Sequence, residues 1–159
     1  MYLLNEQLDG FRGSVFRQTM FAEFEHEIHT MKESGTPLTA GALNKLYGEL
    51  NKKYFGDSVS YDDNIATEWA RIPHFYMNYY VYQYSTGYAA AQSLADQVLR
   101  GGKDVAERYM NEFLKKGSSD YPINVLKNAG VDMTTTEPIE NAMKVFERQL
   151  NELEALLDK

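Results

Sequence analysis

The sequence predicts an all-α protein, a multi-helix domain of about seven helices that spans residues 1–159 as a single domain. Apolar side chains recur at helical spacing through most segments, and glycines and prolines fall between those segments, where they begin or end helices. With 43% hydrophobic and 13% aromatic residues, the chain can bury a core and does not have the composition of a disordered tail.

In the first half, apolar spacing predicts helical segments at residues 3–11, 14–34, 40–56 and 64–70. Thr39 is suited to cap the third of these, because its hydroxyl can accept a backbone N–H. The polar stretch 56–63 is a loop or, at residues 58–61, a brief extended segment. A break is expected at Ile72, because the residue before a proline is biased away from the helical conformation.

The second half opens on the longest predicted helix, which runs from the break at Ile72 to Leu99. Its first part is apolar or aromatic on every side, a pattern typical of a buried helix, and Gly101 and Gly102 end it. Further helices are expected at residues 103–116, 122–128 and 136–157, with Thr136 as the cap of the last. The fold class is therefore all-α with one long, buried, aromatic-rich helix.

Composition and charge exclude several classes of partner and site. The net charge of −7 argues against nucleic acid, whose binding proteins cluster lysine and arginine. The absence of cysteine excludes a disulfide, a zinc thiolate site and a thiol nucleophile. The N-terminus lacks the pattern of a signal peptide, and no stretch approaches ~20 uninterrupted apolar residues. We therefore expect a cytoplasmic chain with no nucleic-acid partner and no membrane association.

One segment comes close to a zinc motif. His26-Glu-Ile-His29-Thr30 resembles His-Glu-x-x-His, but its second histidine comes one residue early, and Thr30 holds the position of the ligand. The favoured interpretation is two polar histidines on a solvated helix face, with no metal ligand in this chain. That face carries three acidic residues, Glu23, Glu25 and Glu27. A metal shared by His26 and His29 is the alternative.

The second feature is aromatic. Six tyrosines and one histidine lie between residues 74 and 88, and on a continuous helix Tyr76 and Gln83 would share a face with Tyr79 or Tyr80. A buried tyrosine hydroxyl needs a hydrogen-bond partner, so a plain core would use phenylalanine or leucine more economically. Donors that face a cleft could stabilise an oxyanion or bind a peptide, whereas an aromatic stripe that fills the core is the alternative.

A polar set also accompanies the apolar residues of the segment 14–24. Arg17, Gln18 and Glu23 either form a buried polar network or lie on the solvent-exposed face of their helix.

Two long motifs carry a resemblance to a known family. FRGSVFRQTMFAEFE at residues 11–25, and Trp69-x-x-Ile-Pro-His-Phe-Tyr76 followed by YYVYQYSTG at residues 79–87, resemble oligoendopeptidase F, a family related to thimet oligopeptidase. The resemblance covers essentially the whole chain. It matches the C-terminal part of the catalytic domain of an enzyme several times longer, so the chain is expected to be a domain fragment.

The resemblance implies a metallopeptidase that hydrolyses short peptides with a zinc ion held by His-Glu-x-x-His and a further glutamate. This sequence lacks that motif. We therefore expect no cofactor in this chain, zinc in the complete family enzyme, and no activity of the chain alone. Whether the chain takes part in catalysis at all is left open.

The resemblance also implies roles for residues of the aromatic segment. In the family enzymes the matching segment forms the wall of the substrate-binding site. Tyr82 is expected to donate to the oxyanion, with His74 as the second catalytic residue. Tyr76, Tyr79 and Tyr80 are expected to contact the peptide.

Partners follow from the same resemblance. Helices that normally pack against absent parts of the enzyme would expose apolar surface, so we expect self-association or an N-terminal catalytic partner. Two alternatives come from other classes of protein. One is a helical peptide-binding or interaction module without catalysis, and the other is a metal-binding helical protein that uses His26 and His29.

Overall fold

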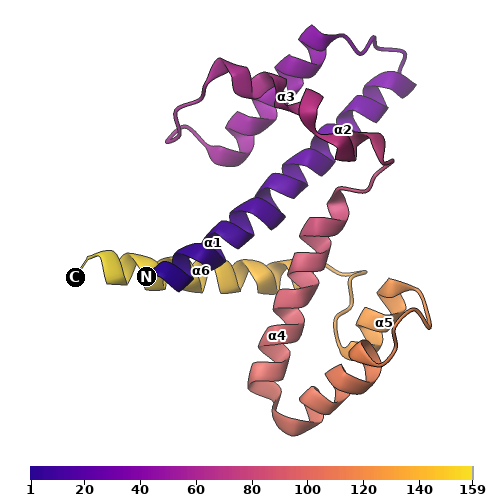
Figure 1. Ribbon diagram of the computed structural model, residues 1–159, viewed down its shortest axis with the longest axis vertical. Coiled ribbons are helices and arrows are strands. Elements are labelled where there is room, and N and C mark those ends of the chain that lie inside the picture. The colour runs from indigo at the N-terminus through magenta and orange to yellow at the C-terminus, as the bar shows by residue number, and fades with distance from the viewer. Residues whose placement is uncertain (159) are drawn as a thin grey trace. The chain divides into compact units, whose positions relative to one another are not determined.

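The computed structural model describes residues 1–158, which form helices and connecting loops without a strand (Figure 1). The α-helices are α1 (Tyr2–Phe11), α2 (Arg17–Glu33), α3 (Ala40–Phe55), α4 (Tyr82–Arg108), α5 (Pro122–Ala129) and α6 (Glu137–Leu157). Two π segments, η1 (Arg12–Phe16) and η4 (Tyr109–Leu114), and two 3-10 segments, η2 (Asp63–Arg71) and η3 (Pro73–Tyr76), complete the described part. The all-α class is confirmed, and the number of α-helices is near the predicted seven.

Contacts group the chain into two compact units. Unit 1 consists of residues 1–11 with residues 86–158, and unit 2 consists of residues 12–85. The expectation of a single domain over residues 1–159 stays a prediction. Each unit is described by itself below.

The core of unit 1 includes the end of α1. The Phe11 ring is fully buried and packs edge-on against Tyr88 of α4, with ring centroids 5.0 Å apart, and against Phe146 of α6 at 5.4 Å. Gly10 permits this close approach, because a Cβ at that position would lie 2.8 Å from the Tyr88 hydroxyl oxygen. The predicted segments 3–11 and 14–34 are not separated by a loop, since the π segment η1 directly follows α1 and precedes α2.

The core of unit 2 is apolar and aromatic. Its buried residues are Met20, Phe21, Phe24, Leu43, Tyr47, Leu50, Ile72 and Val81. These side chains come from α2, α3 and the two ends of the segment that leads from η2 to α4. Because the chain enters this core at Ile72 and again at Val81, the residues between them are tied at both ends.

Helix ends in unit 2 follow the local signals in the sequence. Thr39 caps α3 as predicted, with its hydroxyl oxygen 3.2 Å from the Ala42 nitrogen that donates to it, and Gly56 ends the helix. Residues 58–61 form a loop and not an extended strand. The break at Ile72 is confirmed, since its φ of −90° and ψ of 103° are extended.

The longest helix departs from the prediction. It begins at Tyr82, because residues 73–81 form a short 3-10 turn, a bend and a turn. The predicted end is confirmed, since Gly102 leaves the helical conformation with φ 69° and ψ −160° and kinks α4.

Thr136 does not cap α6 in the predicted way. Its backbone is already helical, and its hydroxyl lies 2.7 Å from the Glu140 side chain instead of accepting a backbone N–H.

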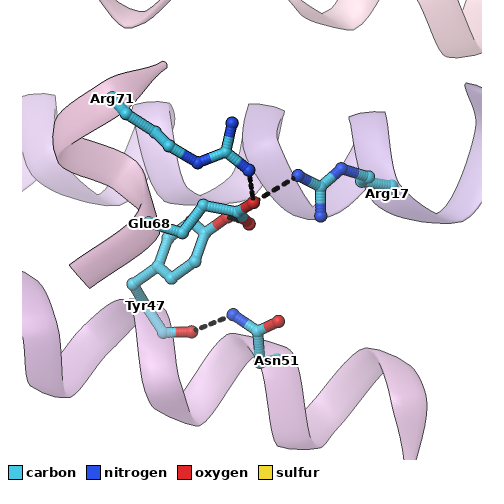
Figure 2. Close-up of polar contacts among 5 residues, drawn as sticks. All are labelled: Arg17, Tyr47, Asn51, Glu68 and Arg71. Carbon is cyan, nitrogen blue, oxygen red and sulfur yellow. Dashed lines mark hydrogen bonds and ion pairs between the residues drawn. The ribbon is translucent and has the colours of Figure 1, made fainter. Parts of the chain in front are cut away.

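A buried carboxylate joins α2, α3 and η2 in unit 2 (Figure 2). The Glu68 Oε1 atom, in η2, accepts hydrogen bonds from the guanidinium groups of Arg17 at 2.8 Å and of Arg71, which converge on that one oxygen. The Oε2 atom accepts from the Tyr47 hydroxyl of α3 at 2.7 Å, and Asn51 donates to the Tyr47 carbonyl at 2.9 Å. The network fixes η2, and with it the start of the aromatic segment, against α2 and α3.

The network accounts for two shifted pKa values. Burial on its own would raise the pKa of Glu68, but the hydrogen bonds from Arg17 and Tyr47 and the two positive charges outweigh it and lower that pKa. Burial raises the pKa of the Tyr47 hydroxyl, and its hydrogen bond to the Glu68 carboxylate raises it further. Tyr47 is therefore a permanent donor near neutral pH.

A buried polar network and a solvent-exposed face were both open for Arg17, Gln18 and Glu23, and the structure gives Arg17 and Glu23 separate partners on partly exposed side chains. Arg17 binds Glu68, whereas Glu23 accepts hydrogen bonds from Lys53 and, at 2.7 Å, from the Tyr54 hydroxyl.

Replacing Tyr47 by phenylalanine removes the donor to a buried carboxylate oxygen. We expect Tyr47→Phe to lower the free energy of unfolding by about 1–3 kcal/mol, the cost of leaving a buried acceptor without its partner. Urea denaturation of the chain measures this change. Tyr121→Phe is the matched control, because the Tyr121 side chain is exposed and its hydroxyl is accessible to water. Equal unfolding midpoints for the wild type and Tyr47→Phe would contradict the role of the network.

The lowered pKa of Glu68 predicts an acid-sensitive contribution to stability. In the unfolded chain Glu68 takes up a proton near its ordinary pKa of 4.5, and in the folded chain only at lower pH. The contribution is therefore complete above that pH and is lost as the pH falls through the folded-state pKa. The difference in unfolding free energy between the wild type and Glu68→Gln should shrink between about pH 7 and about pH 3. A difference that stays constant over that range would be inconsistent with an ionised, paired Glu68.

Candidate functional site

The candidate site is the tyrosine segment, which we define as residues 73–84 of unit 2. It begins with η3, bends at Met77–Tyr79 and enters α4 at Tyr82. Ile72 before it and Val81 within it are buried in the core of unit 2. Between these two positions Phe75 also packs on the core, against Phe21 and Phe24, whereas the tyrosines of the segment are exposed.

A strained bend lies at the centre of the tyrosine segment. Asn78 and Tyr79 both have positive φ, 47° and 60°. Asparagine tolerates this left-handed conformation, but for tyrosine it costs about 1–2 kcal/mol. The Tyr79 amide donates a hydrogen bond to Oε1 of Glu25 in α2 at 2.7 Å, which helps to hold the bend. This contact between distant positions explains why the predicted helix does not start at Pro73.

The predicted burial of the aromatic segment is wrong. The side chain of Tyr76 is 81% exposed, and the other tyrosines of the segment are also exposed. They are Tyr79, Tyr80, Tyr82 and Tyr84. The grouping of Tyr76 and Gln83 with Tyr79 or Tyr80 on one helix face is wrong as well, because residues 77–81 are not helical.

Three side chains of the segment meet in what we call the aromatic cluster, His74, Tyr80 and Tyr84. The His74 and Tyr80 rings are stacked, 5.6 Å apart and 6° from parallel, and the Tyr84 ring is nearly perpendicular to both, at 5.7 and 5.5 Å. The Tyr84 hydroxyl lies 3.4 Å from His74 Nε2 and 3.3 Å from the Tyr80 hydroxyl, to which it donates. The cluster thus gathers two phenols and an imidazole on an exposed surface.

The Tyr84 hydroxyl of the aromatic cluster keeps its proton near neutral pH. The hydrogen bond to Tyr80 raises the pKa of Tyr84 above its ordinary value. A protonated phenol can donate a hydrogen bond to a ligand oxygen and accept one from a ligand N–H. The cluster therefore suits a ligand that carries both groups, as a peptide backbone does.

Two other predicted site residues, Tyr79 and Tyr82, make separate contacts. Tyr79 packs its ring on His29 of α2, with centroids 4.5 Å apart. Tyr82 is the first residue of α4, and its carbonyl accepts a hydrogen bond from the Ser85 hydroxyl at 3.0 Å. Tyr84 belongs to the cluster although sequence reasoning left it out. The spacing of four between Tyr80 and Tyr84 was the available signal, and it was not used in predicting the site.

The near-zinc motif holds no metal site in the described part of the chain. His26 is exposed as expected, but His29 packs on Tyr79 and Glu25 is only 1% exposed, so the solvated-face interpretation is wrong for Glu25. Among residues 1–158, no three histidine, aspartate or glutamate side chains lie close enough together to hold a metal ion. The donor set of these residues does not fit a zinc ion.

Unit 1 carries a large apolar groove of about 890 Å³ along α4, η4 and α5. Its lining includes Ala90, Leu94, Val98, Phe113 and Val125, with Asp120 among the few polar side chains. An open apolar groove of this size typically marks a surface that another chain segment or a ligand covers.

Comparison with known proteins identifies the class. The family model described as Peptidase family M3 matches residues 1–145, and the chain therefore belongs to peptidase family M3. Within that family the chain is similar to oligoendopeptidase F, as its motifs predicted. It is 62% identical over 159 residues to Oligopeptidase PepF of Bacillus subtilis and 54% identical over 157 residues to Group B oligopeptidase PepB of Streptococcus agalactiae.

A solved structure agrees with this assignment. The crystal structure of oligoendopeptidase-F from Enterococcus faecium matches 99% of this chain with a TM-score of 0.94 and 57% sequence identity. This chain covers 30% of that structure's chain, 24% of the Bacillus protein and 26% of the Streptococcus protein. It thus spans about a quarter of the length of the curated relatives, and its placement in their C-terminal part stays a prediction.

Two further expectations concern the membrane and the roles of the site residues. None of the helices in residues 1–158 is long and apolar enough to cross a membrane. The roles given to Tyr82, His74, Tyr76, Tyr79 and Tyr80 stay predictions.

Proposed function

We propose that this chain is the substrate-binding part of a zinc metallo-oligopeptidase that hydrolyses short peptides, and that it is inactive without a segment that carries the zinc ligands. The observation that carries the proposal is the aromatic cluster, in which His74, Tyr80 and Tyr84 converge on an exposed surface. Membership of peptidase family M3, with relatives named as oligopeptidases, supports a peptide as the ligand.

The chemistry of the cluster supports peptide binding. A peptide backbone alternates carbonyl acceptors with N–H donors, and phenol and imidazole groups can meet both. Tyrosine rings add apolar contact area at a low cost in side-chain entropy, because they have only two rotatable bonds. The stacked His74 and Tyr80 rings and the perpendicular Tyr84 ring therefore make a rigid, amphipathic surface for a short extended ligand.

Tyr82 is the proposed donor to the oxygen of the scissile carbonyl. Its side chain is exposed at the first residue of α4, two positions after Tyr80 of the cluster. A phenol that donates where negative charge develops stabilises the transition state more than the bound substrate, and so raises the rate of the chemical step. Zinc chemistry would come from the segment that carries His-Glu-x-x-His, since residues 1–158 provide no donor set for it.

The apolar groove of unit 1 supports a protein partner. Its floor is formed by small and aliphatic side chains of α4, and Leu99 beside it is 85% exposed. Because the curated relatives are about four times longer than this chain, further parts of the same peptidase are the natural occupants. A second copy of this chain would cover the same surface when those parts are missing.

A complementation experiment tests the proposal. The chain is mixed with the Bacillus subtilis relative from which the matching region has been removed. Size-exclusion chromatography then reports whether the two associate, and a fluorogenic short peptide reports hydrolysis. We expect neither part to cleave the peptide alone and the complex to do so. A stable complex without hydrolysis would contradict the proposal.

Within that complex, Tyr82→Phe should lower kcat by ~100- to 1000-fold, because it removes one hydrogen-bond donor to the oxyanion without changing the ring. The matched control is Tyr121→Phe, which removes an exposed hydroxyl elsewhere in the chain and should leave kcat unchanged. Full activity of Tyr82→Phe would remove Tyr82 from the proposed role.

A binding module without catalysis is the second candidate, and the same exposed cluster favours it. It predicts that the peptide binds to the chain and that no complex restores hydrolysis. Titration of the chain with the uncleaved peptide, followed by tyrosine fluorescence, separates this outcome from the first.

A further inference from the structure

We propose that Glu25 and His29 of α2 are positioning residues that clamp Tyr79 and thereby hold the tyrosine segment in the conformation that forms the aromatic cluster. The inference rests on the proposed function for its catalytic consequence, but the clamp itself is a statement about unit 2 alone. It also gives a role to His29 of the near-zinc motif, which belongs to no group of three metal-ligating side chains in the described part of the chain.

The burial of Glu25 requires a compensating partner. Its side chain is 1% exposed, and it follows Phe24 of the apolar core of unit 2 in the sequence. Taking a carboxylate out of water costs several kcal/mol unless hydrogen bonds offset it. The Tyr79 amide supplies such a bond at 2.7 Å, from a residue 54 positions further along the chain.

The partner of Glu25 is the most strained residue of the segment. Tyr79 has a φ of 60° and follows Asn78, which has a φ of 47°. A non-glycine residue stays in this conformation only where its surroundings hold it there. A charge-assisted hydrogen bond to the Tyr79 amide is stronger than one between neutral groups and favours the strained bend over a regular helical turn.

His29 completes the clamp from the same face of α2. Residues four apart on a helix are neighbours, so His29 lies one turn beyond Glu25. The His29 and Tyr79 rings are 4.5 Å apart and 36° from parallel. Thus α2 contacts both the amide and the ring of Tyr79, which fixes the backbone and the side chain together.

The clamp acts on the cluster through the chain itself. Tyr80 follows Tyr79 directly, and its ring stacks on His74 at 5.6 Å. Val81, the next residue, is fully buried. If the bend at Tyr79 relaxes, Tyr80 is the residue that must turn, because Val81 is anchored in the core.

Two substitutions at Glu25 separate the clamp from a general effect on folding. Glu25→Gln keeps a carbonyl oxygen in reach of the Tyr79 amide, whereas Glu25→Leu fills a similar volume without an acceptor. Amide hydrogen exchange of the isolated chain, followed by NMR, is the first measurement. Tyr79 exchange should stay slow in the wild type and Glu25→Gln, and become about 10-fold faster or more in Glu25→Leu, the factor expected for one lost buried hydrogen bond.

The matched control is Glu33→Gln, an exposed glutamate on the same helix, which should leave Tyr79 exchange unchanged. Unchanged Tyr79 exchange in a folded Glu25→Leu chain would overturn the clamp. If Glu25→Leu does not fold, His29→Ala is the second variant. It removes only the ring contact and should speed Tyr79 exchange, and an unchanged rate would again overturn the proposal.

The second measurement uses the complemented peptidase. Glu25→Leu should lower kcat more than it changes KM, Glu25→Gln should recover most of the loss, and combination with Tyr82→Phe should give less than the product of the two effects. Multiplicative effects would show that Glu25 acts on stability alone and would overturn its positioning role. A harmless Tyr82→Phe would instead refute the proposed function and leave the exchange result intact.

Discussion

The fold of unit 2 depends on one constraint, which is that the chain between η2 and α4 is fixed in the core at both Ile72 and Val81. The residues between these anchors cannot continue a buried helix for two reasons. The Tyr79 amide donates a hydrogen bond to Glu25, and the backbone of both Asn78 and Tyr79 adopts positive φ. The tyrosine rings between the anchors therefore reach the surface, while Phe75 packs on the core. The buried Glu68 network fixes the preceding segment in the same way, so the tyrosine segment emerges from a rigid base.

Local chemistry was sufficient to predict part of this structure. The cap at Thr39, the break at Ile72 and the kink at Gly102 each depend on one residue and its immediate neighbours, and each was predicted. Thr136 shows the limit of such signals, because its hydroxyl has a competing partner in Glu140.

The start of α4 could not be predicted in this way. Aromatic spacing near Tyr80 fits a helix as well as a bend, and the deciding contact comes from Glu25, far away in the sequence. The same contact explains why Glu25 is buried, although glutamate side chains are usually exposed to solvent. The aromatic cluster could not be predicted for a related reason, since the meeting of His74 with Tyr80 and Tyr84 follows from the bend and not from a helical wheel.

Family membership and the structure of the described residues give different information about this chain. Peptidase family M3 gives the class of reaction, while the chain covers about a quarter of its curated relatives. What the described residues provide is a donor-rich aromatic surface on one unit and an apolar groove on the other. Both features are exposed surfaces, and the proposed occupants are a peptide for the first and protein for the second.

Hydroxyl-radical footprinting of the isolated chain, read by mass spectrometry, tests most directly whether the tyrosine segment is a presented surface. We expect Tyr76, Tyr80 and Tyr84 to be oxidised at rates comparable to that of the exposed Tyr121, while the fully buried Tyr47 stays unmodified. Protection of Tyr80 and Tyr84 to the same degree as Tyr47 would mean that these rings fill an interior, and the proposed peptide surface would not exist.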